Sequence, residues 1–267
     1  MKLLDTVIHR WLRVPYTLHV SKFRRPRKGA PLIVFVHGIG NSGLVWHTII
    51  DQLPENVGVM TVDLLGFGQS PGPRWATYNV NTQARSLLTT ILKRGVTSPV
   101  ILVGHSLGTL VGIEFARRYP IAVRQLLLCS PPLYKSLDEV TRLSPESSLR
   151  ALYRLIRKRP NELIAITKLA LRLKLINESF DISTENVPAF MATLESSIIN
   201  QDSLRHALNV TKPTTIVVGR LDPLVVMSNL KLVANRNPNV TLKVLPGSHD
   251  VIGAYRQGIA NTLNSML

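Results

Sequence analysis

The sequence predicts an α/β fold: a doubly wound, mostly parallel sheet with helices on both faces and a helical cap inserted after the sixth strand. Short apolar runs rich in β-branched residues recur along the 267-residue chain, with helically spaced segments between them. Residues 132–211 lack such a run. The chain therefore divides into a core of residues 1–131 and 212–267 and a cap of residues 132–211.

The apolar runs are typical of strands that are covered on both faces of a parallel sheet. One further segment, YTLHVSKF (16–23), alternates in polarity and predicts an antiparallel strand nearer an edge. The predicted buried strands span residues 31–38, 57–64, 98–105, 123–130, 213–220 and 240–247.

Helices are expected between these strands, because apolar residues recur there at helical spacing. Strands and helices that alternate in this order favour an open, doubly wound sheet. The predicted helices span residues 43–53, 79–95, 107–119, 223–236 and 250–266.

The interval 132–211 contains helix-like pieces separated by Pro145, Pro160 and Pro188. It is too long for an ordinary connection between a helix and a strand. We expect it to cover the carboxyl edge of the sheet, where ligands of such folds bind. The apolar piece 163–175 has two equal interpretations: a roof over an acyl group that touches lipid, or a helix packed on the body.

The composition, 45% hydrophobic and 18% charged, supports a single folded domain with a substantial core. The single cysteine, Cys129, excludes an intrachain disulfide and is expected to be a small buried hydrophobe. Asp5 interrupts the first apolar stretch, so we expect no secretory signal. No apolar run approaches the roughly 20 residues of a membrane-spanning helix. These features together predict a cytoplasmic location.

The chain is strongly basic, with 32 Lys and Arg against 16 Asp and Glu and a net charge of +16. Segments 1–31 and 150–174 each carry eight bases and one acid. A solvated basic surface is the favoured interpretation, and weak association with an anionic membrane surface is the alternative. The amphipathic segment 3–14 also has two interpretations: it lies on a membrane surface, or, as is more common, it docks onto its own domain. No specific nucleic acid is expected, because neither cluster interleaves aromatic residues, and the oligomeric state stays open.

The segment Gly104-His105-Ser106-Leu107-Gly108 carries the main chemical motif. Between a strand and a helix, G-x-S-x-G forms a sharp turn that exposes a serine hydroxyl in a strained backbone conformation. A side chain at either glycine would collide as the strand and helix close on each other. We therefore interpret Ser106 as a nucleophile rather than an incidental turn residue.

A serine nucleophile needs a base, and the base needs an orienting acid. His249 follows the last predicted strand and Asp222 follows the strand before it, so both should meet Ser106 at one edge of the sheet. Asp250 is the weaker acid candidate, because consecutive side chains in a turn rarely face each other. His105 is expected to pack within the turn rather than react.

A negatively charged reaction intermediate needs preorganised hydrogen-bond donors. The segment HGIG (37–40) follows a predicted strand, and its glycines let the Ile39 N–H turn toward the site. The Leu107 N–H, next after the nucleophile, is the second expected donor. His37 is expected to brace this loop by hydrogen bonding.

In these motifs, and in DLLGFGQS (63–70), the chain resembles the serine-nucleophile branch of the α/β-hydrolase superfamily over nearly its whole length. The resemblance implies that Asp63 and its glycines shape one wall of the site. It also implies acyl chemistry, whereas superfamily members that open epoxides or displace halide have an aspartate where this chain has Ser106.

The sequence thus predicts a serine esterase that acts on a small-molecule carboxylic ester with an apolar, small-to-medium acyl group and needs no metal or organic cofactor. Other acyl chemistry is the alternative within enzymes: a thioesterase, a carbon–carbon bond hydrolase or an acyltransferase. The alternative from another class is a ligand-binding receptor module with little turnover.

Overall fold

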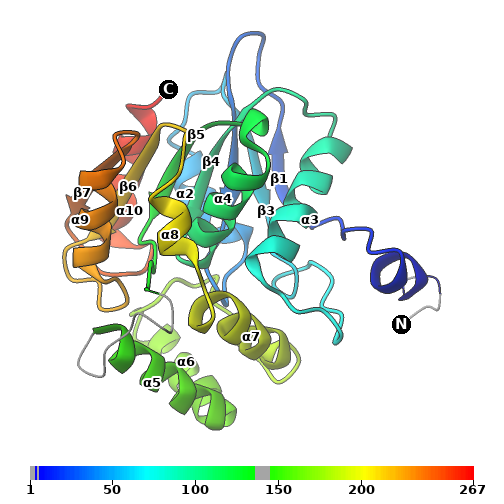
Figure 1. Ribbon diagram of the computed structural model, residues 1–267, viewed down its shortest axis with the longest axis vertical. Coiled ribbons are helices and arrows are strands. Elements are labelled where there is room, and N and C mark those ends of the chain that lie inside the picture. The colour runs from blue at the N-terminus through cyan, green and yellow to red at the C-terminus, as the bar shows by residue number, and fades with distance from the viewer. Residues whose placement is uncertain (1–3, 5, 136–144) are drawn as a thin grey trace.

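The computed structural model describes residues 4, 6–135 and 145–267. Within them, seven strands form one sheet in the order β1-β3-β2-β4-β5-β6-β7 (Figure 1). The edge strand β1 (Val20–Arg24) pairs antiparallel with β3 (Gly58–Val62), and all other neighbours pair parallel. The predicted α/β fold with a mostly parallel sheet is therefore confirmed.

The elements follow the predicted alternation of strands and helices, with shifted ends. The remaining strands are β2 (Leu32–Val36), β4 (Val100–His105), β5 (Val123–Cys129), β6 (Thr214–Gly219) and β7 (Val240–Leu245). The α-helices are α2 (His47–Ile50), α3 (Val80–Lys93), α4 (Leu107–Arg118), α5 (Pro145–Lys158), α6 (Pro160–Arg172), α7 (Val187–Thr193), α8 (Ser203–Ala207), α9 (Met227–Arg236) and α10 (Gly253–Asn264).

Two apolar cores cover the two faces of the sheet, because successive strand residues point to opposite faces. In β2, Val34 and Val36 join the core that contains α3, α4 and α9. Ile33 and Phe35 join the other core, with α2 and α10. All five residues of β2 are buried, which explains its uninterrupted apolar sequence.

The carboxyl ends of the central strands lie level with one another, which places the loops of the site side by side. His105 at the end of β4 pairs with Cys129 at the end of β5. The Ser106 N–H then donates to the Cys129 carbonyl at 2.9 Å, and the Ser130 N–H to the Val217 carbonyl of β6 at 2.8 Å. These bonds bring the first residue after each strand to one edge.

A helical insertion comprises the residues between β5 and β6. Its helices α5, α6 and α7 lie at this carboxyl edge (bottom of Figure 1), and α8 packs beside α4. The described part of the insertion, 130–135 and 145–213, contains helices and no strand, and the predicted cap residues 136–144 lie outside the described residues. The insertion follows the fifth strand of the described chain, not the sixth as expected. The segments predicted as strands before it also number five, so the sixth position was wrong: 16–23, 31–38, 57–64, 98–105 and 123–130. Pro145 and Pro160 each begin a helix, where proline is well tolerated.

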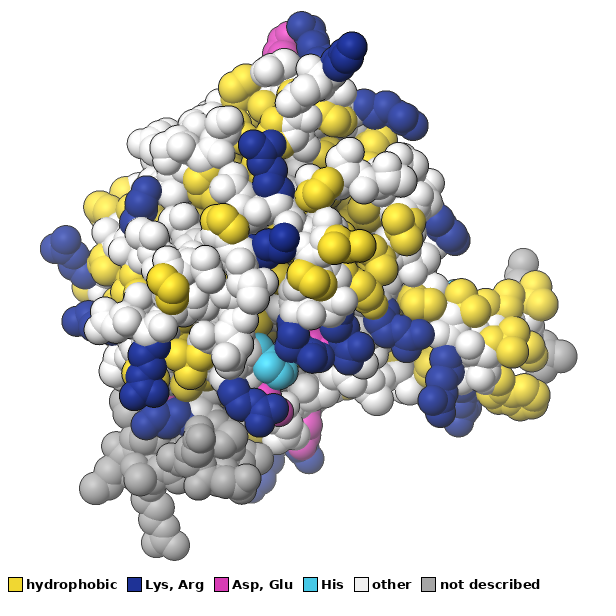
Figure 2. All heavy atoms as spheres, turned by 45° about the horizontal axis from the view of Figure 1, so that its top comes forward, with side chains coloured by type: hydrophobic (Ala, Val, Ile, Leu, Met, Phe, Trp, Pro, Cys, Tyr) yellow, Lys and Arg dark blue, Asp and Glu magenta, His cyan; other side chains and the backbone are white. Residues whose placement is uncertain are grey.

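The N-terminal segment packs on the domain through one side and leaves the other side exposed. The ring of His9, in a π-helix (Thr6–Trp11), stacks on Tyr16 with centroids 3.7 Å apart. Trp11 and Leu12 are exposed. Figure 2 shows apolar and basic side chains side by side on this projecting arm. No helix in the described residues has the length and apolar character needed to cross a membrane.

Candidate active site

Ser106 occupies a sharp turn between β4 and α4. Its φ of 49° lies in the left-handed region, which costs a non-glycine residue conformational energy. A Cβ atom at Gly104 would collide with the Gly108 carbonyl, and one at Gly108 with the Val36 carbonyl. The strand and helix can therefore approach only because both positions lack a side chain, as expected.

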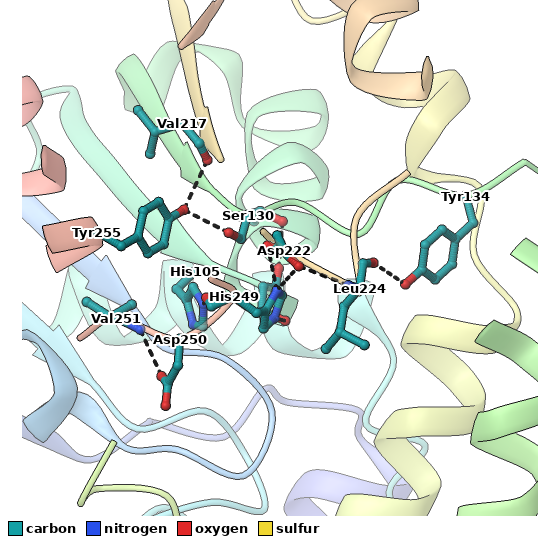
Figure 3. Close-up of polar contacts among 12 residues, drawn as sticks. His105, Ser130, Tyr134, Val217, Asp222, Leu224, His249, Asp250, Val251 and Tyr255 are labelled. Atoms are coloured by element: carbon teal, nitrogen blue, oxygen red, sulfur yellow. Dashed lines mark hydrogen bonds and ion pairs between the residues drawn. The ribbon is translucent and has the colours of Figure 1, made fainter. Parts of the chain in front are cut away.

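The structure brings Ser106, Asp222 and His249 into one hydrogen-bonded chain. Figure 3 shows Asp222 beside His249 in this chain. The His249 Nδ1 lies 2.9 and 2.8 Å from the two Asp222 carboxylate oxygens. Its Nε2 lies 3.0 Å from the Ser106 Oγ. Because a carboxylate only accepts, Nδ1–H donates to Asp222, which leaves Nε2 free to accept the Ser106 hydroxyl proton.

The environment keeps the buried Asp222 carboxylate ionised. Burial opposes this charge, but the hydrogen bond and charge of His249 prevail and hold the pKa of Asp222 below its ordinary value. The Leu224 N–H also donates to the carboxylate at 2.9 Å, and the neighbouring Ser130 hydroxyl contributes to the lowered pKa. An ionised acid at this position favours the His249 tautomer that can accept a proton from serine.

Ser130 and Tyr255 form a supporting pair that the sequence analysis did not find. Ser130 follows β5 with φ of 52°, and its Oγ lies 2.8 Å from the Tyr255 hydroxyl. The same hydroxyl lies 3.1 Å from the Val217 carbonyl. Burial raises the pKa of Tyr255, so the phenol keeps its proton. This pair holds the Ser130 hydroxyl against Asp222 (Figure 3).

His105 and Asp250 form hydrogen bonds with backbone groups near His249 and not with Ser106. The buried His105 ring places Nε2 at 2.8 Å from the His249 carbonyl, to which it donates. Burial, with a smaller contribution from His249, lowers the pKa of His105 to about 4, so the ring is neutral near pH 7. Asp250 accepts from the N–H groups of Val251 and Asn177. Asp222 is thus the carboxylate that meets the His249 ring.

The loop 37–40 faces the nucleophile turn. Leu107 is the first residue of α4, so its N–H has no acceptor within the helix. The Ile39 N–H donates to no other residue in the described part of the chain. His37 braces this loop as expected: its Nδ1 lies 2.7 Å from the Gly38 carbonyl, and its Nε2 accepts from the Leu64 N–H at 2.8 Å.

Asp63 holds the neighbouring loop together and lies outside the hydrogen-bonded chain. Its carboxylate accepts from the Gly43 N–H at 2.7 Å and from the Gln69 N–H at 2.9 Å. Its carbonyl accepts from the Ser70 hydroxyl at 2.6 Å. These bonds support a structural role for Asp63. No residue of segment 63–70 lines the cavity at Ser106, so the expectation that this segment shapes one wall of the site is not met.

A cavity of about 290 Å³ opens above Ser106 and is mostly apolar. Larger hollows lie at the amino edge of the sheet and beside the N-terminal arm, but no residue of the hydrogen-bonded chain lines them. The insertion supplies most of the apolar wall of the site cavity: Tyr153, Ile156, Leu175, Ile176, Phe180, Phe190, Leu194 and Ile198.

The insertion is also tied to the loop 37–40. The Asp181 N–H donates to the Gly40 carbonyl at 2.7 Å, and the Ser179 hydroxyl to the Asn41 side chain at 2.7 Å. A Cβ atom at Gly40 would meet the Phe180 ring at 2.7 Å. The segment after α6 therefore helps to set the position of the loop that carries Ile39.

Two further observations concern cofactors and cysteine chemistry. Among residues 4, 6–135 and 145–267, no three His, Cys, Asp or Glu side chains are grouped to hold a metal ion. Cys129 is buried, as expected, and burial raises the pKa of its thiol. This cysteine therefore has little thiolate character.

The fold and site can now be compared with known proteins. A family model described as the alpha/beta hydrolase fold matches residues 31–252. The chain belongs to the alpha/beta hydrolase fold family. Among solved structures, a thermophilic esterase from Thermogutta terrifontis superposes on 95% of this chain and 97% of its own, with a TM-score of 0.71 and 19% identity. At that identity the likeness shows the fold alone.

Two alpha/beta hydrolase relatives show how far the sequence likeness extends. The chain is 29% identical over 114 residues to the probable lysophospholipase BODYGUARD 2 of Arabidopsis thaliana. This match covers 41% of this chain and 24% of that protein. The chain is 33% identical over 114 residues to the lipase LipV of Mycobacterium tuberculosis, and this match covers 43% of this chain and 41% of LipV. The matches thus span less than half of each relative.

Proposed function

We propose that this alpha/beta hydrolase is a serine esterase that cleaves carboxylic esters with an apolar, small-to-medium acyl group. The observation that carries the proposal is the hydrogen-bonded chain from Asp222 through His249 to Ser106, which ends at an apolar cavity. The names of the relatives, a lysophospholipase, a lipase and an esterase, accord with it.

In the acylation step, His249 Nε2 accepts the Ser106 proton while Oγ attacks the ester carbonyl carbon. The carbonyl oxygen becomes an oxyanion that accepts from the N–H groups of Ile39 and Leu107. When the intermediate collapses, the carbon–oxygen bond to the alcohol breaks and His249 returns its proton to the leaving oxygen. Asp222 stabilises the imidazolium that exists between these transfers.

Deacylation repeats the same proton transfers with water as the nucleophile. His249 removes a proton from water, the hydroxyl attacks the acyl carbon, and the second intermediate releases the carboxylic acid. His249 then returns the proton to Ser106 Oγ, which restores the starting state. Over the whole cycle, His249 accepts and returns each proton, so no other proton carrier is needed.

Residues 132–211 act as a lid in this proposal. Their described part supplies most of the apolar wall above Ser106, as an acyl group requires. At about 30 Å³ for each small group, the cavity of about 290 Å³ holds roughly eight to ten heavy atoms. We therefore expect kcat/KM to rise about fourfold with each early methylene, from about 0.8 kcal/mol of burial, and to fall once the cavity is full.

The test is a panel of p-nitrophenyl esters of increasing acyl length, with wild type beside Ser106→Ala, His249→Ala and the exposed control Ser228→Ala. Turnover and labelling by a fluorophosphonate should disappear in the first two variants and persist in the control. Equal turnover by Ser106→Ala would exclude Ser106 as the nucleophile. Ligand binding without multiple turnover would favour a receptor, and a strong preference for thioesters would favour a thioesterase.

A further inference from the structure

The outer face of α6 exposes a stripe of large apolar side chains. Ile166, Leu169 and Leu173 are 64%, 56% and 60% exposed. Their spacing of three and four residues places them along one side of the helix. Leu155 on the neighbouring helix α5 is exposed as well. Single exposed leucines are common on soluble proteins, but a continuous stripe indicates an interaction surface.

Basic side chains flank this stripe and lack acidic partners. Of the exposed bases in α5, α6 and the residues just after them, Arg157 pairs with Glu195, and Arg159 pairs with Glu162 at 3.2 Å. The others make no ion pair with any described residue; they are Arg154, Lys158, Lys168, Arg172 and Lys174. The surface is therefore both apolar and cationic.

The stripe continues into the wall of the site cavity. Leu175, two residues beyond Leu173, is 62% exposed and yet lines the cavity above Ser106. Ile176 beside it lines the same cavity. An apolar molecule that leaves a surface in contact with Leu173 therefore meets apolar side chains up to the nucleophile.

We propose that this surface, the α6 face (Ile166, Lys168, Leu169, Arg172 and Leu173), docks on an anionic lipid surface. Such a surface takes apolar side chains at the level of its headgroups while its negative charge attracts the neighbouring bases. The charge complementarity selects anionic over neutral lipid. Docking itself does not require catalysis, whereas the delivery of a membrane-held ester past Leu175 rests on the proposed esterase function.

Docking is measured by co-sedimentation of the full chain carrying Ser106→Ala with phosphatidylcholine vesicles, with and without phosphatidylglycerol. We expect binding only to the anionic vesicles, weakened by salt because the attraction is screened. Lys168→Glu with Arg172→Glu should weaken binding at least about 25-fold, from about fivefold for each lost base near the surface.

Matched pairs separate the α6 face from the overall charge. Arg25→Glu with Arg124→Glu changes the net charge equally but lies around the hollow at the amino edge of the sheet, so binding should stay within about threefold. Ile166→Ser with Leu169→Ser should weaken binding at least about tenfold. The pair Leu92→Ser and Ile121→Ser, also exposed, should leave it unchanged.

Three results would overturn the docking proposal. The first is an equal loss of vesicle binding in the α6 pairs and the control pairs. The second is equal binding to neutral and anionic vesicles. The third is a loss of binding only in Trp11→Ser with Leu12→Ser, which would place the docking surface on the N-terminal arm. Sedimentation velocity tests a different occupant of the α6 face. A dimer that dissociates in Ile166→Ser with Leu169→Ser would show that this face binds a second copy of the chain instead of lipid.

Turnover of a soluble p-nitrophenyl ester, with Ser106 restored, checks that the variants fold. It also separates the two proposals. Vesicle binding by a chain that turns over no ester would leave docking standing and refute the esterase, whereas ester turnover without vesicle binding would do the reverse.

Discussion

Replacement of His105 tests whether this buried ring positions the catalytic base. The ring makes one hydrogen bond in the described structure, from Nε2 to the His249 carbonyl at 2.8 Å. Its centroid lies 5.1 Å from that of the His249 ring. The variants His105→Ala and His105→Gln separate the packing of the ring from the hydrogen bond, because the glutamine amide can still donate to the carbonyl.

The magnitude follows from burial. His105→Ala leaves the part-buried His249 carbonyl unpaired, at about 1–3 kcal/mol, and a cavity, at about 2–4 kcal/mol. The sum, roughly 3–7 kcal/mol, is a large part of the roughly 5–15 kcal/mol that typically stabilises a domain. A displaced His249 should lower kcat about 10- to 100-fold. His105→Gln should restore most of kcat, with KM little changed in both variants.

The pH dependence of stability supplies a second readout. The pKa of His105 falls from 6.5 to about 4 in the folded chain. Between these values the unfolded chain binds a proton that the folded chain does not, so stability falls as the pH falls through this window. From pH 6.5 to pH 5 the loss is about 2 kcal/mol, at about 1.4 kcal/mol per pH unit.

Urea unfolding at both pH values, for wild type and His105→Gln, measures this loss. The variant should lack the contribution of about 2 kcal/mol, while the other histidines contribute equally to both proteins. An unchanged pH dependence in His105→Gln would refute the electrostatic reasoning. Wild-type kcat in His105→Ala would refute the positioning role.

Two further predictions concern the acid. Asp222→Asn should lower kcat about 10⁴-fold with little change in KM, because it favours the wrong His249 tautomer. Asp250→Asn should lower kcat less than about tenfold. If steady-state kinetics showed Asp250→Asn to be the more damaging, Asp250 would be the orienting acid. Tyr255→Phe loosens the Ser130 hydroxyl, which should raise the pKa of Asp222 toward its ordinary value. The variant should then lose more stability in urea unfolding at pH 7 than at pH 3, because the lowered pKa stabilises the fold only while Asp222 is ionised. Equal losses at the two pH values would leave Tyr255 as packing alone.

Local pattern was sufficient to predict the sheet and the nucleophile turn. The apolar runs correspond to β2 to β7. The strands β2, β3 and β4 are buried at every position, as expected of strands covered on both faces. The prediction of a buried strand at 240–247 was wrong, because β7 lies at the edge of the sheet and exposes Thr241, Lys243 and Val244. The glycines at 104 and 108 are imposed by the close approach of strand and helix. Element ends were less predictable: the helix expected at 43–53 is a 3-10 turn followed by α2, which ends at Ile50.

The sequence by itself determined the order of strands and helices and the edge at which Ser106, Asp222 and His249 meet, because both follow from local periodicity and from the direction of parallel strands. Only the tertiary structure decided which groups support them. Ser130 and Tyr255 are 125 positions apart, and His105 bonds a carbonyl 144 positions away. Such contacts depend on how the loops pack at the carboxyl edge, and no local pattern of residues encodes that packing.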